Sequence, residues 1–453
     1  MEEKQKDHYW LKSGTINILQ NFSGVFFGFA GFYVLVRVLS KHDFGVWTLF
    51  LSTTTILEAI RSGLIQNALI KYISSSDNRE HPEIITASFA ISGAVSLVTI
   101  AGILALAPFL SHIWDSPQLV GLLYAYIAIY IFSGLQAQFN AVEQANFRFN
   151  GIFATTIIKQ GSFFCFVLVC YVFSLHVELI YLVWVQTFSA FLAAALAFRY
   201  AHKNLRWSEG ISRGWAGKLF GYGKYAFGTL ISSLLSSTID QMMLGALLSP
   251  AASGAFNIAV RITNLIDIPG NAVATIVFPQ SARRMETEGK SAIKYLYEKS
   301  VGTTLALVLP FVVFLYLFSD LVIHLIAGEK YNDSIPLLRI TLLYCLLIPF
   351  GRQFGNILDS IGKTRLTFLV VIGSATLNLC LNYFFIRSIG VMGAAYATLC
   401  SNILGFIVAQ VILKKEINTN ILNTFVYMYR FYPEFLERYV IPFWKRKFVK
   451  GEK

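Results

Sequence analysis

Residues 84–112 read IITASFAISGAVSLVTIAGILALAPFLSH, a stretch without a single Asp, Glu, Lys or Arg. A helix of about 20 mostly apolar residues is long enough to cross the hydrocarbon core of a bilayer. The same character extends outward over the whole chain of 453 residues, of which 55% are hydrophobic and only 14% charged. Soluble proteins are about 25% charged. The composition therefore excludes a soluble multidomain protein and indicates an all-α integral membrane protein with many transmembrane helices.

Short segments that are charged or rich in Pro or Gly divide the chain into apolar stretches. We expect each of these stretches to form a transmembrane helix. Twelve such stretches lie at residues 13–39, 44–71, 84–112, 117–140, 151–174, 178–200, 219–247, 251–280, 300–326, 335–359, 365–386 and 390–413. The loops between them are too short to form a soluble catalytic domain. The patterns of zinc hydrolases, P-loop enzymes and serine hydrolases are also missing from the sequence. We therefore expect no catalytic residues, no metal site and no cofactor.

The net charge of +12 is explained by topology. With the N-terminus inside, 27 of the 37 Lys and Arg residues fall in cytoplasmic segments, and the outward loops hold only Lys41, Lys330 and Arg387. Basic residues accumulate on the cytoplasmic side of membrane proteins. Both termini are therefore predicted to be cytoplasmic, and the basic excess does not call for a nucleic-acid partner.

A short motif occurs twice at the junction of two stretches. Residues 39–45 read LSKHDFG, and residues 248–254, at an offset of 209, read LSPAASG. The same offset pairs Glu58 with Asp267. Because the offset contains an even number of helices, the two halves have the same orientation, as in transporters built from parallel repeats around a central cavity. We expect two pseudo-symmetric six-helix bundles, residues 1–210 and 211–413, followed by a tail.

The tail, residues 414–453, combines nine basic residues with Phe, Tyr and Trp. Its longest uncharged run, residues 417–429, is too short to span a bilayer. Two interpretations remain open. The tail either lies at the cytoplasmic membrane interface, held by aromatic residues and anionic lipid, or is a loosely ordered solubilising segment.

Charges within the stretches are expensive to place in a bilayer and mark functional sites. We single out ten, with a basic excess of four: Arg37, Arg61, Lys159, Lys224, Arg261, Arg339 and Arg352 against Glu58, Asp240 and Asp267. A basic excess indicates an anionic substrate, because the basic and acidic residues would be equal in number if they only formed ion pairs with one another. Arginine suits phosphate in particular, since its planar fork donates two hydrogen bonds to one oxyanion.

The depth of each residue, meaning its distance from the ends of its apolar stretch, separates the stronger candidates from the weaker ones. Arg61, Arg261 and Arg352 lie about ten or more residues from either end of their stretches and are the strongest candidates for a cationic cavity. Lys159 is intermediate. Arg37 and Arg339 lie near the outer face and Lys224 near the inner face, so all three can also reach the interface. Of these, Arg37 and Lys224 are retained as cavity candidates.

The acidic residues Glu58, Asp267 and Asp240 are candidates for coupling transport to a proton or sodium gradient. A buried carboxylate resists ionisation, so it can load and release a proton. Glu58 and Arg61 are three residues apart on one helical face, which leaves open the alternative that they only neutralise each other.

Motifs spread over the chain carry a resemblance to a known family. They are Arg37 to Ser40 with Phe44-Gly45 and Ser62-Gly63-Leu64, Ile239-Asp240, Gly254 to Ala259, Phe278-Pro279, Gly355 to Leu358 with Gly362-Lys363, Leu381-Asn382, and Gly390 to Ala395. In order and spacing they resemble the Wzx-type flippases of the polysaccharide transporter family, within the multidrug/oligosaccharidyl-lipid/polysaccharide superfamily. The position two before Gly63 is often acidic in that family, but here it is Arg61. This departure leaves the coupling role of the second stretch in doubt, although Glu58 stands one turn earlier.

The resemblance implies a MATE-like fold, with alternating access in the bacterial cytoplasmic (inner) membrane. It also implies a substrate, an undecaprenyl-pyrophosphate-linked oligosaccharide that is the repeat unit of an O-antigen, capsule or exopolysaccharide. The implied partners are this lipid-linked oligosaccharide, membrane lipids, and the polysaccharide polymerase and other assembly proteins.

Two other functions remain as alternatives. A multidrug or cation exporter of the same superfamily would be expected to have an acidic cavity instead of a basic one. A membrane polysaccharide polymerase or ligase usually carries a large outward loop with catalytic Arg and His residues, whereas the outward loops here hold three basic residues in all. The sequence therefore favours the flippase over both.

Overall fold

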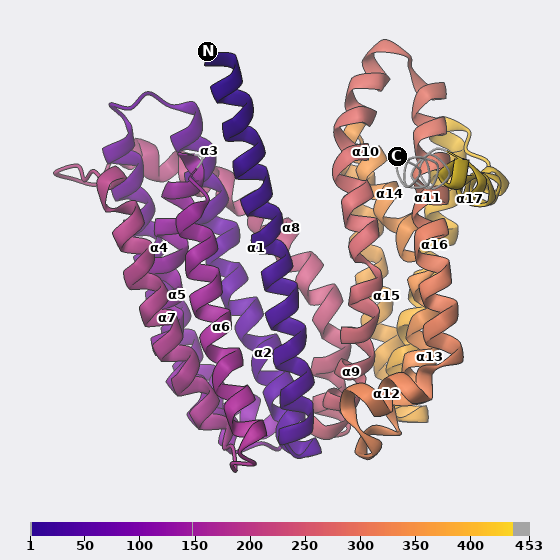
Figure 1. The fold of residues 1–453 in the computed structure, drawn as a ribbon, viewed down its shortest axis with the longest axis horizontal. Helices are drawn as coiled ribbons and strands as arrows, with labels where there is room; N and C mark the ends of the chain where they lie inside the picture. Colours follow the sequence, from indigo (N-terminus) through magenta and orange to yellow (C-terminus); the bar gives the residue numbers. More distant parts are fainter. Residues whose placement is uncertain (1, 147, 438–453) are drawn as a thin grey trace, which may run out of the picture. The chain divides into compact units, whose positions relative to one another are not determined.

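The computed structural model describes the backbone of residues 2–146 and 148–437. Side chains are described from Leu19 onward, apart from residues 21, 225, 226, 229, 232, 233, 235, 236, 275, 276, 278, 279, 282, 286 and 287. The side chains of the Phe278-Pro279 motif and the tail residues 438–453 thus lie outside the described part. Among the described residues every regular element is a helix, as Figure 1 shows, so the all-α prediction is confirmed.

The chain forms two compact units, residues 1–254 and 255–453. The first contains α1 (Glu2–Val38), α2 (Lys41–Arg61), the π-helix η1 (Ser62–Gln66), α3 (Asn67–Ser75), α4 (His81–Ile113), α5 (Gln118–Ala145), α6 (Asn150–Val172), α7 (Leu179–Ala201), the short 3₁₀-helix η2 (His202–Asn204), α8 (Arg213–Leu247) and the start of α9 (Pro250–Ile266). The second contains the rest of α9, then α10 (Ile268–Thr287), α11 (Lys290–Leu317), α12 (Ser319–Ala327), the 3₁₀-helix η3 (Glu329–Tyr331), α13 (Ser334–Cys345), α14 (Ile348–Ser360), α15 (Thr364–Ile389), α16 (Val391–Ile417) and α17 (Ile421–Phe435).

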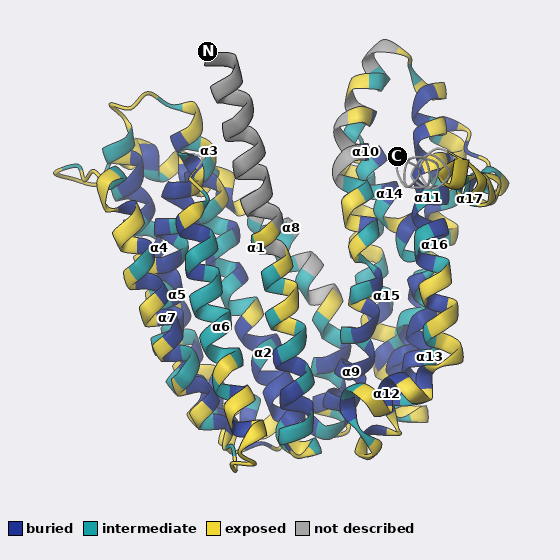
Figure 2. Ribbon diagram, in the orientation of Figure 1, coloured by how far each residue is buried: buried dark blue, intermediate teal, exposed yellow. Residues whose placement is uncertain are grey.

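All twelve predicted stretches coincide with helices, either continuous or broken. Eight segments of the described residues are long and apolar enough to cross a membrane: α4, α5, α6, α7 with η2, α11, α13 with α14, α15 and α16. The protein is therefore a multi-pass membrane protein. Figure 2 shows exposed positions along α4, where Leu97 and Val98 are 70% and 73% exposed. Such apolar outer faces are what a lipid environment accommodates.

The second predicted stretch is a helix with a defect. After Arg61 the α-helical hydrogen bonding widens into the π-helix η1 before α3 resumes it. Here α8 approaches closely, because a β-carbon at Gly63 would lie 2.9 Å from Phe227 Cα and one at Gly223 only 1.8 Å from the Leu64 carbonyl oxygen. Two glycines thus permit a backbone contact that no larger residue would allow. Single π turns of this kind are frequent at functional sites.

Three predicted stretches of the second unit are also broken. Residues 300–326 divide into α11 and α12 at Phe318. Residues 251–280 divide into α9 and α10 at Asp267, with Pro269 in the first turn of α10. Residues 335–359 divide into α13 and α14 at Leu346 and Leu347, with Pro349 in the first turn of α14. Proline fits the first turn of a helix but cannot donate a hydrogen bond to the preceding turn. Each proline therefore starts a new helix, and α10 and α14 pack against one another.

The repeated motif forms a close contact within the first unit. Ser40 caps α2 by accepting a hydrogen bond from the Asp43 backbone N–H at 3.0 Å. A β-carbon at Gly45 would lie 2.0 Å from the Pro250 carbonyl oxygen, and one at Gly254 would lie 3.1 Å from Gly45 Cα. The glycines that the 209-residue offset pairs are therefore in contact with each other.

Helix α17 docks on α11, and Figure 1 shows it crossing the direction in which α11 runs. The buried Glu298 accepts from the Asn420 backbone N–H at 2.7 Å and from Asn423 Nδ2 at 2.9 Å. A β-carbon at Gly302 would lie 2.6 Å from the Thr424 carbonyl oxygen. A charged cap at the start of α17 and a glycine contact in its middle hold the first part of the tail to the second unit.

Candidate functional site

A polar cavity of about 490 Å³ lies inside the first unit. Residues of α1, α2, η1, α5, α6 and α8 line it, and its charged residues are Glu58, Arg61 and Lys159. Amides supply most of the remaining polar surface, from Gln20, Gln66, Gln136, Gln138, Asn140 and Gln144. Three of the charged residues predicted from the sequence are thus brought together, with two positive charges against one negative.

Arg61 is the most buried of the three, with 4% of its surface exposed. Its Nη1 donates to the Tyr130 carbonyl oxygen of α5 at 2.7 Å, and its guanidinium lies 4.3 Å from the centre of the Tyr130 ring. A β-carbon at Gly134 would lie 2.5 Å from Nη1, so the missing side chain of Gly134 makes the space that Arg61 occupies. These partners are electrically neutral. The direct partners of Arg61 consequently hold its positive charge in place without neutralising it.

Lys159 and Glu58 complete the charged part of the cavity. Lys159 Nζ donates to Ser133 Oγ at 2.8 Å, which fixes the ammonium beside α5. Within the described residues no ion pair joins Glu58 to Arg61, although both lie near Tyr126. Simple mutual neutralisation of Glu58 and Arg61, the alternative left open by their spacing, therefore has no direct contact to support it.

The second unit holds a different arrangement at its two helix breaks. Arg352 of α14 donates from Nη2 to Asp267, at the break between α9 and α10, and from Nη1 to the side-chain oxygen of Asn271 on α10. About a quarter of each charged side chain of the pair is exposed. The buried Arg352 Nε has no hydrogen-bond partner within the described residues. Arg352 and Asp267 thus form a compensated pair in which the buried Nε–H of Arg352 is left without an acceptor among the described residues.

The remaining candidates are not among the residues that line the polar cavity. Arg261 is four residues after Asn257 on α9, and its Nε lies 3.4 Å from Asn257 Oδ1. The guanidinium of Arg37 lies 4.4 Å from the centre of the Tyr33 ring. Lys224 is exposed and Asp240 is buried, both on α8. None of these four residues lines the cavity.

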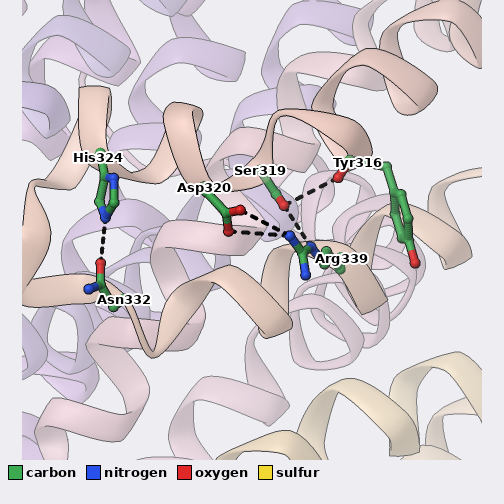
Figure 3. A network of polar contacts seen from close by, with 6 residues as sticks. All are labelled: Tyr316, Ser319, Asp320, His324, Asn332 and Arg339. Atoms are coloured by element: carbon green, nitrogen blue, oxygen red, sulfur yellow. Dashed lines mark hydrogen bonds and ion pairs between the residues drawn. The ribbon is translucent and has the colours of Figure 1, made fainter.

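Arg339 has a partner that the sequence analysis did not assign. Figure 3 shows it between Asp320 and Ser319, with Nη2 at 3.2 Å from Asp320 Oδ2 and Nε at 2.8 Å from Ser319 Oγ. Asp320 lies within the predicted stretch 300–326, so it belongs with the acidic residues inside the stretches. The basic excess there is therefore smaller than four, and Arg339 is a paired residue in the middle of α13.

The sequence analysis also missed most of the uncharged lining. Ser133, Gln136, Asn140 and Gln144 line the cavity from α5. They follow one another at intervals of three and four residues, which places them on one face of a helix. This polar stripe in an otherwise apolar stretch was the available signal. Tyr130 left no such signal, because Arg61 uses its backbone carbonyl.

Transmembrane helices around a cavity lined by charged and amide side chains are typical of membrane transport proteins. Residues 34–336 match the model of the polysaccharide biosynthesis protein family, and the chain belongs to that family. The lipopolysaccharide biosynthesis protein WzxC of Escherichia coli K12 is 22% identical over 416 residues, which are 91% of this chain and 79% of WzxC. The resemblance to Wzx-type flippases is thereby confirmed.

Solved structures agree with the fold. An inward-facing multidrug transporter of the MATE family superposes with a TM-score of 0.75 at 14% identity, covering 87% of this chain and 94% of its own. The lipid II flippase MurJ, in an inward closed conformation, superposes with a TM-score of 0.73 at 14% identity, covering 92% of this chain and 90% of MurJ. The fold is that of these transporters. The probable flippase AglR of Haloferax volcanii is 23% identical over 407 residues, which are 86% of this chain and 81% of AglR, in agreement with the prediction that the chain is not an enzyme.

Proposed function

We propose that this protein is a flippase that moves a polyprenyl-pyrophosphate-linked oligosaccharide across the cytoplasmic membrane. The observation that carries the proposal is the polar cavity of a polysaccharide biosynthesis family member, in which Arg61 is held by neutral partners. A guanidinium with neutral direct partners, in the same cavity as the Lys159 ammonium, suits a pyrophosphate. The MATE-like fold by itself is shared with drug exporters, so the family and the charge of the cavity favour the flippase.

Each part of the cavity has a role in this proposal. A guanidinium has five N–H donors, and Arg61 gives one hydrogen bond to Tyr130 within the described residues. The others are directed to the pyrophosphate, which Lys159 also contacts. Hydrogen bonds to charged groups contribute about 1.5–3 kcal/mol each. The amides of α5 supply donors and acceptors for sugar hydroxyls. Arg37, Lys224, Arg261 and Arg352 belong to the route by which the anion enters or leaves.

Coupling is assigned to the carboxylates Glu58, Asp267 and Asp240. A proton or sodium ion at Asp267 weakens its attraction for Arg352 and so releases the contact between the two broken helices. A freed Arg352 binds the pyrophosphate. The coupling ion, at Asp267, and the pyrophosphate, at Arg352, therefore both act on the same ion pair. Glu58 supplies a second site for a cation within the polar cavity.

The topology follows the sequence prediction. Twelve transmembrane helices form two six-helix bundles, residues 1–210 and 211–413, around a central cavity that opens to alternate sides. Both termini lie in the cytoplasm. Helix α17 lies along the inner membrane surface, where Tyr429, 75% exposed, and the exposed Arg430 meet lipid. The polysaccharide polymerase and other assembly proteins receive the flipped product.

A deletion and a reconstitution test the function together. Cells that lack the protein should accumulate a polyprenyl-pyrophosphate-linked oligosaccharide and lose the corresponding surface polysaccharide. Liposomes that contain the purified protein should expose this extracted lipid to an impermeant glycan-oxidising reagent faster than liposomes without protein. Export of cationic dyes without movement of the lipid-linked sugar would contradict the flippase and support the exporter.

A further inference from the structure

A second cavity in the first unit has the opposite character. It has a volume of about 520 Å³ and is lined by residues of α2, η1, α4, α5 and α8. Among the residues whose side chains the structure describes, its lining contains no charged side chain, and Thr53 and Thr99 are the only hydroxyl-bearing residues among leucine, isoleucine, valine, alanine, glycine and phenylalanine. We call it the apolar groove. A cavity with such walls is suited to a hydrocarbon chain and to no polar ligand.

Helix α2 and η1 separate the apolar groove from the polar cavity. Leu57 and Ile60 face the groove, whereas the next residues in the chain, Glu58 and Arg61, line the polar cavity. In η1, Leu64 lines the groove. Both cavities are also bounded by α5 and α8. A site for a charged group and a site for an apolar chain thus adjoin along the length of one helix.

The groove is open on the side of α4. Two of its lining residues, Val98 and Leu106, are 73% and 55% exposed, so its rim lies on the lipid-facing surface. Gly102 on the same helix adds room, because no atom lies within 4 Å of the position that its β-carbon would take. A lipid chain can therefore enter sideways from the bilayer without leaving an apolar environment.

We propose that the apolar groove holds the isoprenoid chain of the lipid carrier while the pyrophosphate lies in the polar cavity. This assignment rests on the proposed flippase function, whose substrate has an anionic head joined to a long branched hydrocarbon. The charged cavity on one side of α2 matches the anionic head of this lipid, and the apolar groove on the other side matches its hydrocarbon tail. This lipid therefore fits both sites. An amphiphile held at both ends keeps its head beside Arg61, which raises the effective concentration of pyrophosphate there.

The physical basis of selectivity is packing. A chain that moves from lipid into the groove gains no hydrophobic free energy, because both surroundings are apolar. It gains dispersion contacts that depend on fit. The branched walls of the groove favour a methyl-branched isoprenoid over a straight acyl chain. A phospholipid acyl chain is the competing occupant, and the experiment separates the two.

Two glycines of α4 give a matched pair for the test. Gly102 lines the groove, whereas Gly93 does not, and a β-carbon at either meets no atom within 4 Å. The full-length protein in lipid nanodiscs is irradiated with a diazirine-bearing polyprenyl phosphate or a diazirine-bearing phosphatidylglycerol, and labelled peptides are mapped. We expect the polyprenyl probe to label α4 and excess unlabelled polyprenyl phosphate, but not phosphatidylglycerol, to compete. G102F should reduce this label at least fivefold, and G93F should leave it unchanged.

Several results would overturn the groove assignment. Equal labelling of α4 by both probes without selective competition would make the groove a general lipid contact. An unchanged label in G102F, or polyprenyl label confined to other helices, would place the chain elsewhere. G102L, with a smaller side chain, and the monodispersity of each variant on gel filtration control for misfolding. Flipping is measured on the same preparations. A protein that flips the oligosaccharide lipid but labels elsewhere refutes the groove alone, whereas one that flips nothing refutes the function.

Discussion

Both units contain an arginine that links two of their helices, but the charge of that arginine is neutralised by its partner in only one of them. In each, an arginine links the second apolar stretch of its half to the fourth. In the first unit the arginine is Arg61, on the second stretch, and its acceptor on the fourth is the carbonyl oxygen of Tyr130. In the second unit the arginine is Arg352, on the fourth stretch, and its acceptor is the carboxylate of Asp267. The first link keeps its positive charge and the second does not.

The sequence offset makes this comparison sharper. The position 209 residues after Arg61 is Gly270. A β-carbon there would lie 3.1 Å from Asp267 Oδ1 and 3.8 Å from Arg352 Nε. Where the first half carries an arginine, the second half thus carries a glycine that leaves space for an arginine from another helix. The comparison teaches that similar helices can hold either a binding charge or a compensated pair, depending on which helix supplies the guanidinium.

The largest expected effect is that of Arg61→Ala. If the uncompensated charge binds the pyrophosphate, its removal deletes at least two charge-assisted hydrogen bonds, or about 3 kcal/mol, and slows flipping at least about a hundredfold. The thermal stability should change little, because the partners left behind are a carbonyl and an aromatic ring. Flipping in liposomes and melting in detergent measure the two effects. A wild-type flipping rate in a variant of wild-type abundance would remove Arg61 from the site.

In the second unit, we expect loss of the arginine to lower thermal stability more than it does in the first. Arg352→Ala leaves the Asp267 carboxylate without its cation, and breaking a buried ion pair costs about 3–5 kcal/mol, less here because a quarter of each side chain is exposed. We expect a lower melting temperature than for Arg61→Ala. The double variant Arg352→Ala with Asp267→Asn should regain part of the loss, because no unpaired charge remains. Additive losses in this cycle would contradict the pair.

Gly134→Ala tests whether the position of Arg61 matters as well as its presence. The new methyl group would overlap Nη1, which must move away from Tyr130. A displacement of about 1 Å in a positioning group can cost up to about a hundredfold in rate, so we expect a loss of about tenfold. Gly121→Ala is the matched control, since it lies on the same helix with no atom within 4 Å of the added carbon. Equal rates for both variants would show that Arg61 tolerates displacement.

The smallest effect is expected for Gly270→Ala. Its added carbon meets Asp267 Oδ1 at 3.1 Å, a contact that a side chain can relieve by a few tenths of an ångström. We therefore expect a change in flipping rate of less than about threefold, or about 0.6 kcal/mol. The flipping rates of Gly270→Ala and Gly134→Ala together show which of the two arginines, Arg352 or Arg61, is held more tightly. A larger loss from Gly270→Ala than from Gly134→Ala would invert the comparison between the units.

The positions of the apolar stretches were readable from the sequence, because length and hydrophobicity suffice to mark them. The breaks within them were not. Residues 44–71 contain no proline, and the π-helix η1 follows from the close packing of α8 at Gly63 and Gly223. The prolines that begin α10 and α14 were visible in the sequence, but proline in a transmembrane stretch signals a kink as often as a break.

The site was predictable in part. Depth within a stretch ranked Arg61 with Arg261 and Arg352 as the strongest candidates and Lys159 as intermediate, and of these four the structure places Arg61 and Lys159 in the lining of the polar cavity. Depth alone could not separate them from Arg261, because helix rotation decides which residues face a cavity. The partner of Arg352 was equally hidden, since Asp267 lies 85 residues earlier in the chain. Residues brought together by folding over such separations leave no local pattern.

The contact between Gly45 and Gly254 joins two copies of the same motif. It resembles the self-complementary patch of a two-fold symmetric homodimer, in which one surface meets itself. A substitution at either glycine therefore changes a single shared contact. Mutations at the two sites should be non-additive although 209 residues separate them, and neither site can drift independently of the other. The two glycines therefore act as one structural unit although they lie far apart in the chain.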